Sequence, residues 1–235
     1  MLKSGLTKQL VLNLRLHDDA TFANFYPGTN QKIKQVLESL NVKSQNDFIY
    51  LWGKSGTGRS HLAIATCQQL GNLGISTAYL PLKDLSMQSP AVLENLEKMF
   101  LVCVDDLEAI LGQKEWEEAL MYLFNRLQTN GGNFLIIAKE APNALNFILQ
   151  DLKSRLTSCL IFNLMPLTDE EKLAALTLRA KHRSLKLTRE TALFLLRHEQ
   201  RDFKTLVTIL DKLSQAALHS QRALTIPFVK ETLGM

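Results

Sequence analysis

The chain of 235 residues has an ordinary globular composition, with 46% apolar and 21% charged residues, which argues against a disordered or fibrous protein. No apolar run approaches the ~20 residues that a membrane-spanning helix needs, and the first twenty residues lack the apolar core of a signal peptide. Three widely separated cysteines, Cys67, Cys103 and Cys159, argue against a zinc site or a disulfide framework. We therefore predict a cytoplasmic protein of one or two domains.

The net charge of +4 is unevenly distributed along the chain. Basic and acidic residues balance over residues 1–165, whereas residues 166–235 carry twelve Lys and Arg against eight Asp and Glu. This excess is far smaller than the basic surface of a strong DNA-binding protein. Little direct DNA binding is therefore expected.

Short apolar segments alternate with segments of helical period through the first two thirds of the chain. Buried strands are predicted at residues 48–52, 76–82, 100–106 and 133–138. Helices are predicted between them, at residues 60–74, 89–98 and 114–132. Strands that alternate with helices form a parallel sheet with helices on both faces. The sequence therefore predicts an α/β domain.

From residue 166 the pattern is helical only. Thr168 and Glu171 have the spacing of a capping box, which marks a helix start. Further helical segments cover residues 188–199, 202–221 and 226–234. The predicted parts of the chain are an N-terminal tail at 1–20, an α/β domain at 21–165 and a small all-α domain at 166–235.

The segment GKSGTGRS, residues 53–60, has the frame of a phosphate-binding P-loop between a strand and a helix. In such a loop, backbone N–H groups and a helix N-terminus surround phosphate oxygens, and the last hydroxyl binds Mg²⁺. The hydroxyl here belongs to Ser60, a predicted metal ligand. The predicted nucleotide-binding residues are Gly53, Ser55, Gly56, Thr57, Gly58, Arg59, Ser60 and His61.

Asp105 and Asp106 end the predicted strand that follows the P-loop helix and one further strand. A carboxylate at this place can lie near Mg²⁺, and a second one can orient a water molecule. The alternative is a strand that simply ends in polar residues. We assign both aspartates to the nucleotide site, with Asp105 as a metal ligand beside Ser60.

Arg59 stands where a P-loop carries lysine. A guanidinium is planar and bulky, whereas an ammonium is compact enough to lie between two phosphates. The nucleotide should still bind through the loop amides, but the geometry for hydrolysis should suffer. The loop therefore favours a protein that holds a nucleotide over one that turns it over.

Together these segments resemble the AAA+ family and, within it, the DnaA-related proteins of bacterial replication control. The resemblance covers residues 9–235 and rests on TFANFYPGTN (21–30), LVCVDDLEAILG (101–112), QDLKSRL (150–156) and LTIPFVKETLG (224–234). It implies an AAA+ P-loop domain, a parallel sheet sandwiched by helices, followed by a small all-α lid domain. DnaA continues into a helix-turn-helix domain, which is not expected in this sequence.

Two further positions depart from the family pattern. Ile137-Ala138 occupy the end of the fourth predicted strand, where AAA+ proteins usually carry a polar residue that senses the γ-phosphate. Lys204 stands where the lid usually supplies an arginine to the nucleotide. With Arg59, these departures imply bound ADP, with ATP as the alternative, together with Mg²⁺ and weak or absent ATPase activity.

Arg155 lies in the segment that resembles the arginine-finger motif. Residue chemistry alone would favour a solvated surface arginine. The resemblance implies instead that Arg155 acts catalytically in trans, on ATP bound to a neighbouring protein. There an arginine offsets transition-state charge and is worth ~10³–10⁵ in rate.

The segment QLVLNL, residues 9–14, precedes the α/β domain. Its alternating leucines alone predict an edge strand. The resemblance implies instead a peptide that binds the β sliding clamp, and Asn13 stands where proline is usual, so the tail should lose more entropy on binding. The predicted clamp-binding residues are Gln9, Leu10, Leu12 and Leu14.

The favoured hypothesis is a negative regulator of replication initiation. It holds ADP, is tethered to the DNA-loaded β sliding clamp of DNA polymerase III, and presents Arg155 to ATP bound on DnaA. Self-association and a location at the replisome are also expected. The alternatives are an autonomous ATPase of the helicase-loader kind, against which the altered positions argue, and an adaptor that recruits DnaA to the origin, against which the tail argues.

Overall fold

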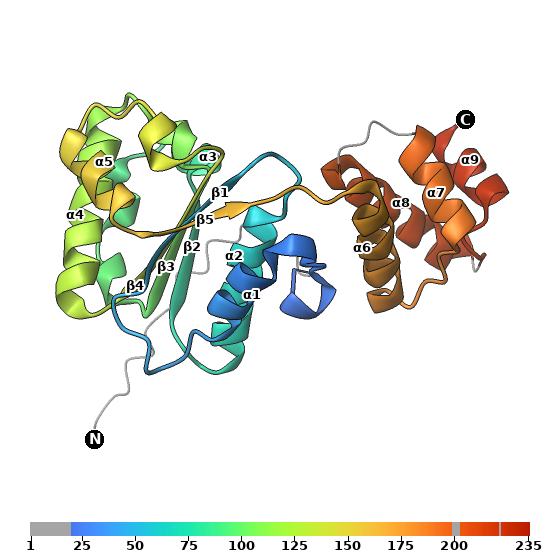
Figure 1. Ribbon diagram of the computed structural model, residues 1–235, viewed down its shortest axis with the longest axis horizontal. Helices are drawn as coiled ribbons and strands as arrows, with labels where there is room; N and C mark the ends of the chain where they lie inside the picture. The colour runs from blue at the N-terminus through green and yellow to red at the C-terminus, as the bar shows by residue number, and fades with distance from the viewer. Residues whose placement is uncertain (1–19, 199–202, 221) are drawn as a thin grey trace, which may run out of the picture.

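The computed structural model describes residues 20–198, 203–220 and 222–235. An α/β domain and a set of lid helices lie side by side, joined through the last strand of the sheet (Figure 1). The predicted clamp-binding residues Gln9, Leu10, Leu12 and Leu14 lie outside the described residues. None of the helices in the described part of the chain is both long and apolar enough to span a membrane.

The sheet is entirely parallel, with the strand order β2-β3-β4-β1-β5. Its strands are β1 (Phe48–Gly53), β2 (Thr77–Pro81), β3 (Leu101–Asp105), β4 (Asn133–Ala138) and β5 (Leu160–Leu164). The four predicted strands are confirmed, whereas β5 was not predicted. It is an edge strand with Leu160 and Ile161 exposed, so it lacks the continuous burial that marks the central strands.

Helices cover both faces of this sheet (Figure 1). They are α1 (Gln31–Glu38), α2 (Arg59–Asn72), α3 (Leu82–Leu85), α4 (Lys114–Asn130) and α5 (Gln150–Thr157). Short 3₁₀ segments lie at Phe22–Asn24, Gly28–Asn30, Pro90–Leu93, Leu96–Lys98, Leu107–Ile110 and Pro142–Ala144. The helix predicted at 89–98 is wrong, because the chain is extended at Glu94 and turns through a positive φ of 64° at Asn95.

The core is divided by the sheet into two layers. Tyr50 and Phe134 pack toward α4, whereas Leu51 and Leu135 pack toward α1 and α2. Every residue of β3 and β4 is buried, and each large apolar side chain that is fully buried stabilises the fold by about 1.5–3 kcal/mol. The central strands therefore form a rigid base at whose carboxyl edge the P-loop and Asp105 lie.

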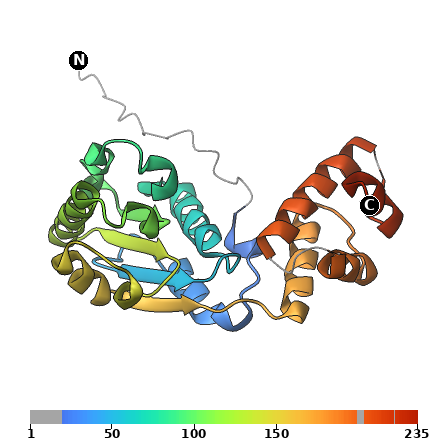
Figure 2. The ribbon, with the colours of Figure 1, turned by 90° about the horizontal axis from the view of Figure 1, so that it is seen from above.

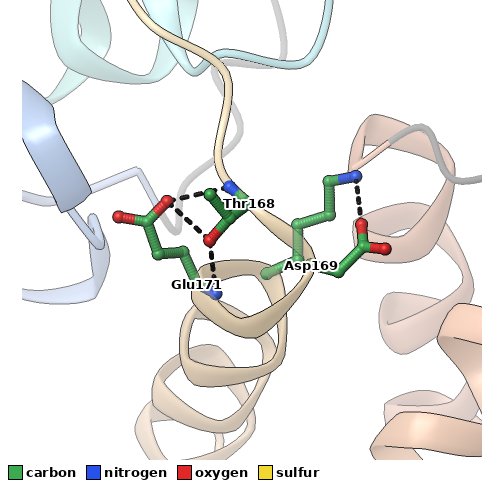
Figure 3. A network of polar contacts seen from close by, with 4 residues as sticks. Thr168, Asp169 and Glu171 are labelled. Carbon is green, nitrogen blue, oxygen red and sulfur yellow. Dashed lines mark hydrogen bonds and ion pairs between the residues drawn. The ribbon is translucent and has the colours of Figure 1, made fainter.

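The lid consists of α6 (Asp169–His182), α7 (Arg189–His198), α8 (Phe203–Ser220) and α9 (Ile226–Leu233). The predicted capping box is present at the start of α6, where the Glu171 carboxylate accepts from the Thr168 N–H at 2.8 Å (Figure 3). In the same turn, Lys172 Nζ lies 3.1 Å from Asp169 Oδ1. Substituting such a cap typically costs about 1 kcal/mol, so the cap fixes where the lid begins.

A buried side chain of the α/β domain holds the segment between β5 and α6. The buried amide of Asn30 accepts from the Met165 N–H at 2.8 Å and donates to the Met165 carbonyl at 2.9 Å. Gly28 lies beside it with a φ of +51°, and a Cβ there would come within 2.7 Å of Glu171 Oε1. These contacts position the lid relative to the sheet.

Candidate nucleotide site

The P-loop runs from the end of β1 to the first turn of α2. Gly58 has a φ of +95°, and a Cβ at this position would lie 2.7 Å from Phe25 Cε2. A Cβ at Gly53 would lie 2.6 Å from the Leu164 carbonyl oxygen. Glycine is needed for the dihedral angle at Gly58 and for the close approach at both positions. The loop therefore has the tight path that lets backbone N–H groups converge on an anion.

A cavity of about 460 Å³ lies over this loop, between the α/β domain and the lid. Figure 2 shows the first described residues, in blue, beside the lid helices. The volume of the cavity is in the range of small-molecule binding sites. The basic residues in its lining are Arg59, Lys83, Lys139, Arg179, Arg183 and Lys204. The acidic ones are Asp106 and Asp211. Among the described residues of the lining, basic side chains therefore outnumber acidic ones, which suits a polyanion.

Most of the predicted site residues are brought together in this cavity. Those in its lining are Ser55, Gly56, Thr57, Gly58, Arg59, Ser60, His61, Asp106 and Lys204. Gly53 and Asp105 lie outside the lining, Gly53 because it is covered by Leu164.

Arg59 is 9% exposed, and its Nη1 is buried without a hydrogen-bond partner among the described residues. A buried donor left unpaired costs free energy, about 1–3 kcal/mol and more for a charged group. An anion in the adjoining cavity is the ligand that would offset this cost. The residue that departs from the P-loop pattern therefore still fits a phosphate.

Asp105 is 2% exposed, and both of its carboxylate oxygens are engaged within the protein. Oδ2 accepts from the Tyr79 hydroxyl at 2.7 Å, and Oδ1 accepts from the Asp106 N–H at 2.8 Å. Burial, together with the nearby Asp105 charge, raises the pKa of Tyr79 far above its usual value, so Tyr79 remains a donor. Direct metal ligation by Asp105 would have to compete with these two bonds, and it stays a prediction.

Asp106, rather than Asp105, faces the cavity. Its backbone has a φ of 56°, and its pKa is raised by burial and by the nearby Asp105 and Glu108 carboxylates. Within the described residues, no group of three or more His, Cys, Asp or Glu side chains could hold a metal ion. Mg²⁺ usually takes one or two carboxylates and completes its shell with phosphates and water, which this site can accommodate.

Replacing Tyr79 with phenylalanine should lower the free energy of unfolding by about 1–3 kcal/mol, because one oxygen of the buried Asp105 carboxylate then lacks its donor. Urea unfolding measures the difference. Tyr122→Phe is the matched control, since Tyr122 is 55% exposed. Equal unfolding midpoints for Tyr79→Phe and the unaltered protein would contradict the role given to this bond.

The end of β4 supplies a basic residue that sequence reasoning missed. Ile137 and Ala138 are both fully buried, and Ala138 pairs with Trp52 inside the sheet. The next residue, Lys139, lines the cavity, with Nζ 3.0 Å from Glu108 Oε1. Its position directly after a buried strand was the signal available in the sequence.

The lid contributes two arginines that sequence reasoning also missed. Arg179 lies on α6 and Arg183 is the residue that caps its C-terminal end, and their spacing of four places them on one face of the helix. Arg179 Nη2 is 2.6 Å from His61 Nδ1, and Arg183 forms an ion pair with Asp211. The lid therefore reaches the first turn of α2 through Arg179.

Arg155 lies in the last turn of α5, away from the chain's own cavity. Its guanidinium carbon is 5.8 Å from the centre of the Phe124 ring. The neighbouring Lys153 is occupied differently, since its Nζ donates to the carbonyls of Asn143 and Leu145, each at 3.0 Å. Action of Arg155 across an interface stays a prediction.

Two protein-family models match this chain. Residues 169–233 match the model described as "Hda, lid domain", and residues 81–163 match the bacterial DnaA ATPase domain. The chain is an Hda/DnaA-like AAA+ protein. The predicted fold class, a parallel AAA+ sheet sandwiched by helices and followed by an all-α lid, is thereby confirmed.

Solved structures of AAA+ proteins share the fold of this Hda/DnaA-like chain. Domain III of the Thermotoga maritima replication initiation protein DnaA superposes with a TM-score of 0.76 at 19% identity, covering 92% of this chain and 96% of that one. AMPPCP-bound DnaA from Aquifex aeolicus gives 0.67 at 18%, covering 83% and 64%. RuvB from Thermotoga maritima gives 0.64 at 15%, covering 91% and 73%. At these identities the likeness concerns the fold.

Proposed function

We propose that this protein is a negative regulator of replication initiation that holds ADP and stimulates hydrolysis of ATP bound to DnaA. The observation that carries the proposal is the pairing of a match to the Hda lid with a P-loop whose lysine is replaced by Arg59. The first connects the chain with DnaA-type replication proteins, and the second argues against efficient turnover of its own nucleotide.

The cavity residues fit a nucleoside diphosphate. The phosphates would be bound by the loop amides, the start of α2 and the cations that line the cavity. Arg59 Nη1, which has no hydrogen-bond partner among the described residues, could donate to a phosphate oxygen. Ser60 and Asp106, which both line the cavity, would hold Mg²⁺ together with Asp105, and the ion would supply charge neutralisation at the phosphates. The likeness to DnaA structures solved with AMPPCP supports a nucleotide here.

The residues of the site are poorly suited to ATP hydrolysis by the protein itself. Arg59 offers a planar fork where a compact ammonium would lie between phosphates. Ile137 and Ala138 are fully buried within the sheet and offer no side-chain donor to a γ-phosphate. A triphosphate therefore gains little over a diphosphate, and we expect ADP to bind at least as tightly as ATP.

The stimulating group is Arg155. It lies on α5 and is not among the described residues that line its own cavity, which supports a role at a site on another protein. At ATP bound to DnaA, the guanidinium would offset charge that develops in the transition state. Residues 9–14 would tether the protein to the DNA-loaded β sliding clamp and so raise the local concentration of Arg155. Self-association would form the same kind of interface with a second copy.

Reconstitution tests the proposal. ATP-charged DnaA, this protein with ADP, and clamp loaded on DNA are combined, and conversion of DnaA-bound ATP is followed with each component omitted in turn. Fast conversion is expected only in the complete mixture. Steady ATP turnover by this protein alone would favour an autonomous ATPase, and recruitment of DnaA to origin DNA without conversion would favour an adaptor.

A further inference from the structure

Helix α6 of the lid presents a row of side chains to the cavity. Ala175, Arg179 and Arg183 follow one another at intervals of four residues, and all three are in the cavity lining. Arg183 forms its ion pair with Asp211 of α8 and so helps to hold the lid helices together. Arg179 instead crosses to the α/β domain, where its Nη2 meets His61 Nδ1 at 2.6 Å.

His61 fixes where the Arg179 guanidinium lies. A guanidinium can only donate, so Nδ1 of the imidazole must accept from Arg179. The other nitrogen, Nε2, then carries the proton and donates to the Thr21 carbonyl at 2.8 Å. The ring also packs against Phe25, with centroids 5.5 Å apart. The imidazole is therefore neutral and held on both sides.

This contact brings the guanidinium to the phosphate end of the site. His61 directly follows Ser60 in the first turn of α2, the end of the helix at which the P-loop amides converge. Arg179 is half-buried there, whereas Lys204, at the start of α8, is exposed. A guanidinium fork also matches phosphate oxygens better than an ammonium does. Position and chemistry both favour Arg179.

We infer that Arg179, positioned by His61, is the lid residue that binds the phosphate oxygens of the nucleotide, and that Lys204 contributes less. The inference rests on the proposed nucleotide site and names a contact within it. Because Arg179 belongs to the lid and His61 to the α/β domain, the same contact fastens the lid over the bound nucleotide.

Calorimetric titration with ADP and Mg²⁺ tests this assignment. Arg179→Ala should weaken ADP binding about tenfold or more, and Arg179→Lys should recover part of the loss. Lys204→Ala should weaken binding less than about threefold. His61→Phe, which keeps a ring beside Phe25 but removes both nitrogens, should weaken binding several-fold because Arg179 loses its support.

Folding is checked apart from binding. Thermal unfolding without nucleotide should give similar midpoints for Arg179→Ala and for Arg222→Ala, a matched control whose arginine pairs with Glu231 elsewhere in the lid. With saturating ADP, Arg222→Ala should gain as much stability as the unaltered protein, and Arg179→Ala less.

The outcomes separate the inference from the proposed function. If the unaltered protein does not bind ADP, the proposed ADP-holding function fails, and the inference fails with it. If it binds ADP and Arg179→Ala binds equally tightly, only the inference is overturned. A larger loss of ADP affinity for Lys204→Ala than for Arg179→Ala would also overturn it. Phosphate binding by the lid would then be assigned to Lys204, the position at which the family usually carries an arginine.

Discussion

The variant Arg155→Ala should lower the stimulated hydrolysis of DnaA-bound ATP by about 10³–10⁵, the range that an arginine supplied to a neighbouring nucleotide is worth. The expected loss is this large because the charge acts only in the transition state. ADP binding by the protein itself should be unchanged, since Arg155 lies away from the cavity on α5. Single-turnover conversion of ATP on DnaA is the measurement.

The controls separate catalysis from folding. Arg155 packs near the Phe124 ring, so its removal can cost about 0.5–1 kcal/mol of stability, which urea unfolding detects. Arg126→Ala is the matched variant, because Arg126 lies on α4 and pairs with Glu97 at 3.3 Å. It should leave stimulation unchanged. Arg155→Lys keeps the charge but loses the fork and should recover only part of the rate.

If Arg155→Ala still stimulated hydrolysis of DnaA-bound ATP at a near-normal rate, another residue would have to act as the arginine finger. Lys153, two residues earlier on α5, is the nearest cation in sequence. Its Nζ already donates to the Asn143 and Leu145 carbonyls, so it would have to give up both bonds to reach a partner. The structure therefore makes Lys153 a weak substitute for Arg155.

The parts of the fold that the sequence predicted are those governed by local chemistry. The strands β1, β3 and β4 are apolar on both faces, and Thr168 and Glu171 form their cap within a single turn. The strand β5 exposes Leu160 and Ile161 at the sheet edge. The 89–98 segment fails as a helix because Asn95 adopts a left-handed backbone conformation, which asparagine tolerates better than most residues but which its sequence neighbours do not dictate.

The candidate site divides in the same way. The P-loop was predictable because its residues are contiguous and its glycines are required for the tight path of the backbone. The contact between His61 and Arg179 joins residues 118 positions apart, and the bond from Tyr79 to Asp105 joins neighbouring strands. Contacts of this kind depend on how the chain is folded in space, so no local sequence pattern predicts them.

Deleting residues 1–14 should abolish binding to the β sliding clamp. An extended peptide that buries Leu12 and Leu14 in clamp pockets would gain about 1.5–3 kcal/mol from each leucine, less the cost of ordering the tail. With both leucines and Gln9 removed, nothing in the proposed tether remains. Surface plasmon resonance with immobilised clamp gives the affinity, and Leu12→Ala tests a single contact.

The deletion should leave the nucleotide site intact, which makes the experiment selective. The described structure from Ala20 onward retains Thr21, whose carbonyl accepts from His61, and Phe25 beside Gly58. ADP affinity and the unfolding midpoint should therefore match those of the full chain, while clamp-dependent stimulation of DnaA is lost because Arg155 is no longer concentrated at loaded clamps. A truncated protein that still captured the clamp would show that residues 9–14 are not the tether, and the alternating leucines would then be better explained as an edge strand.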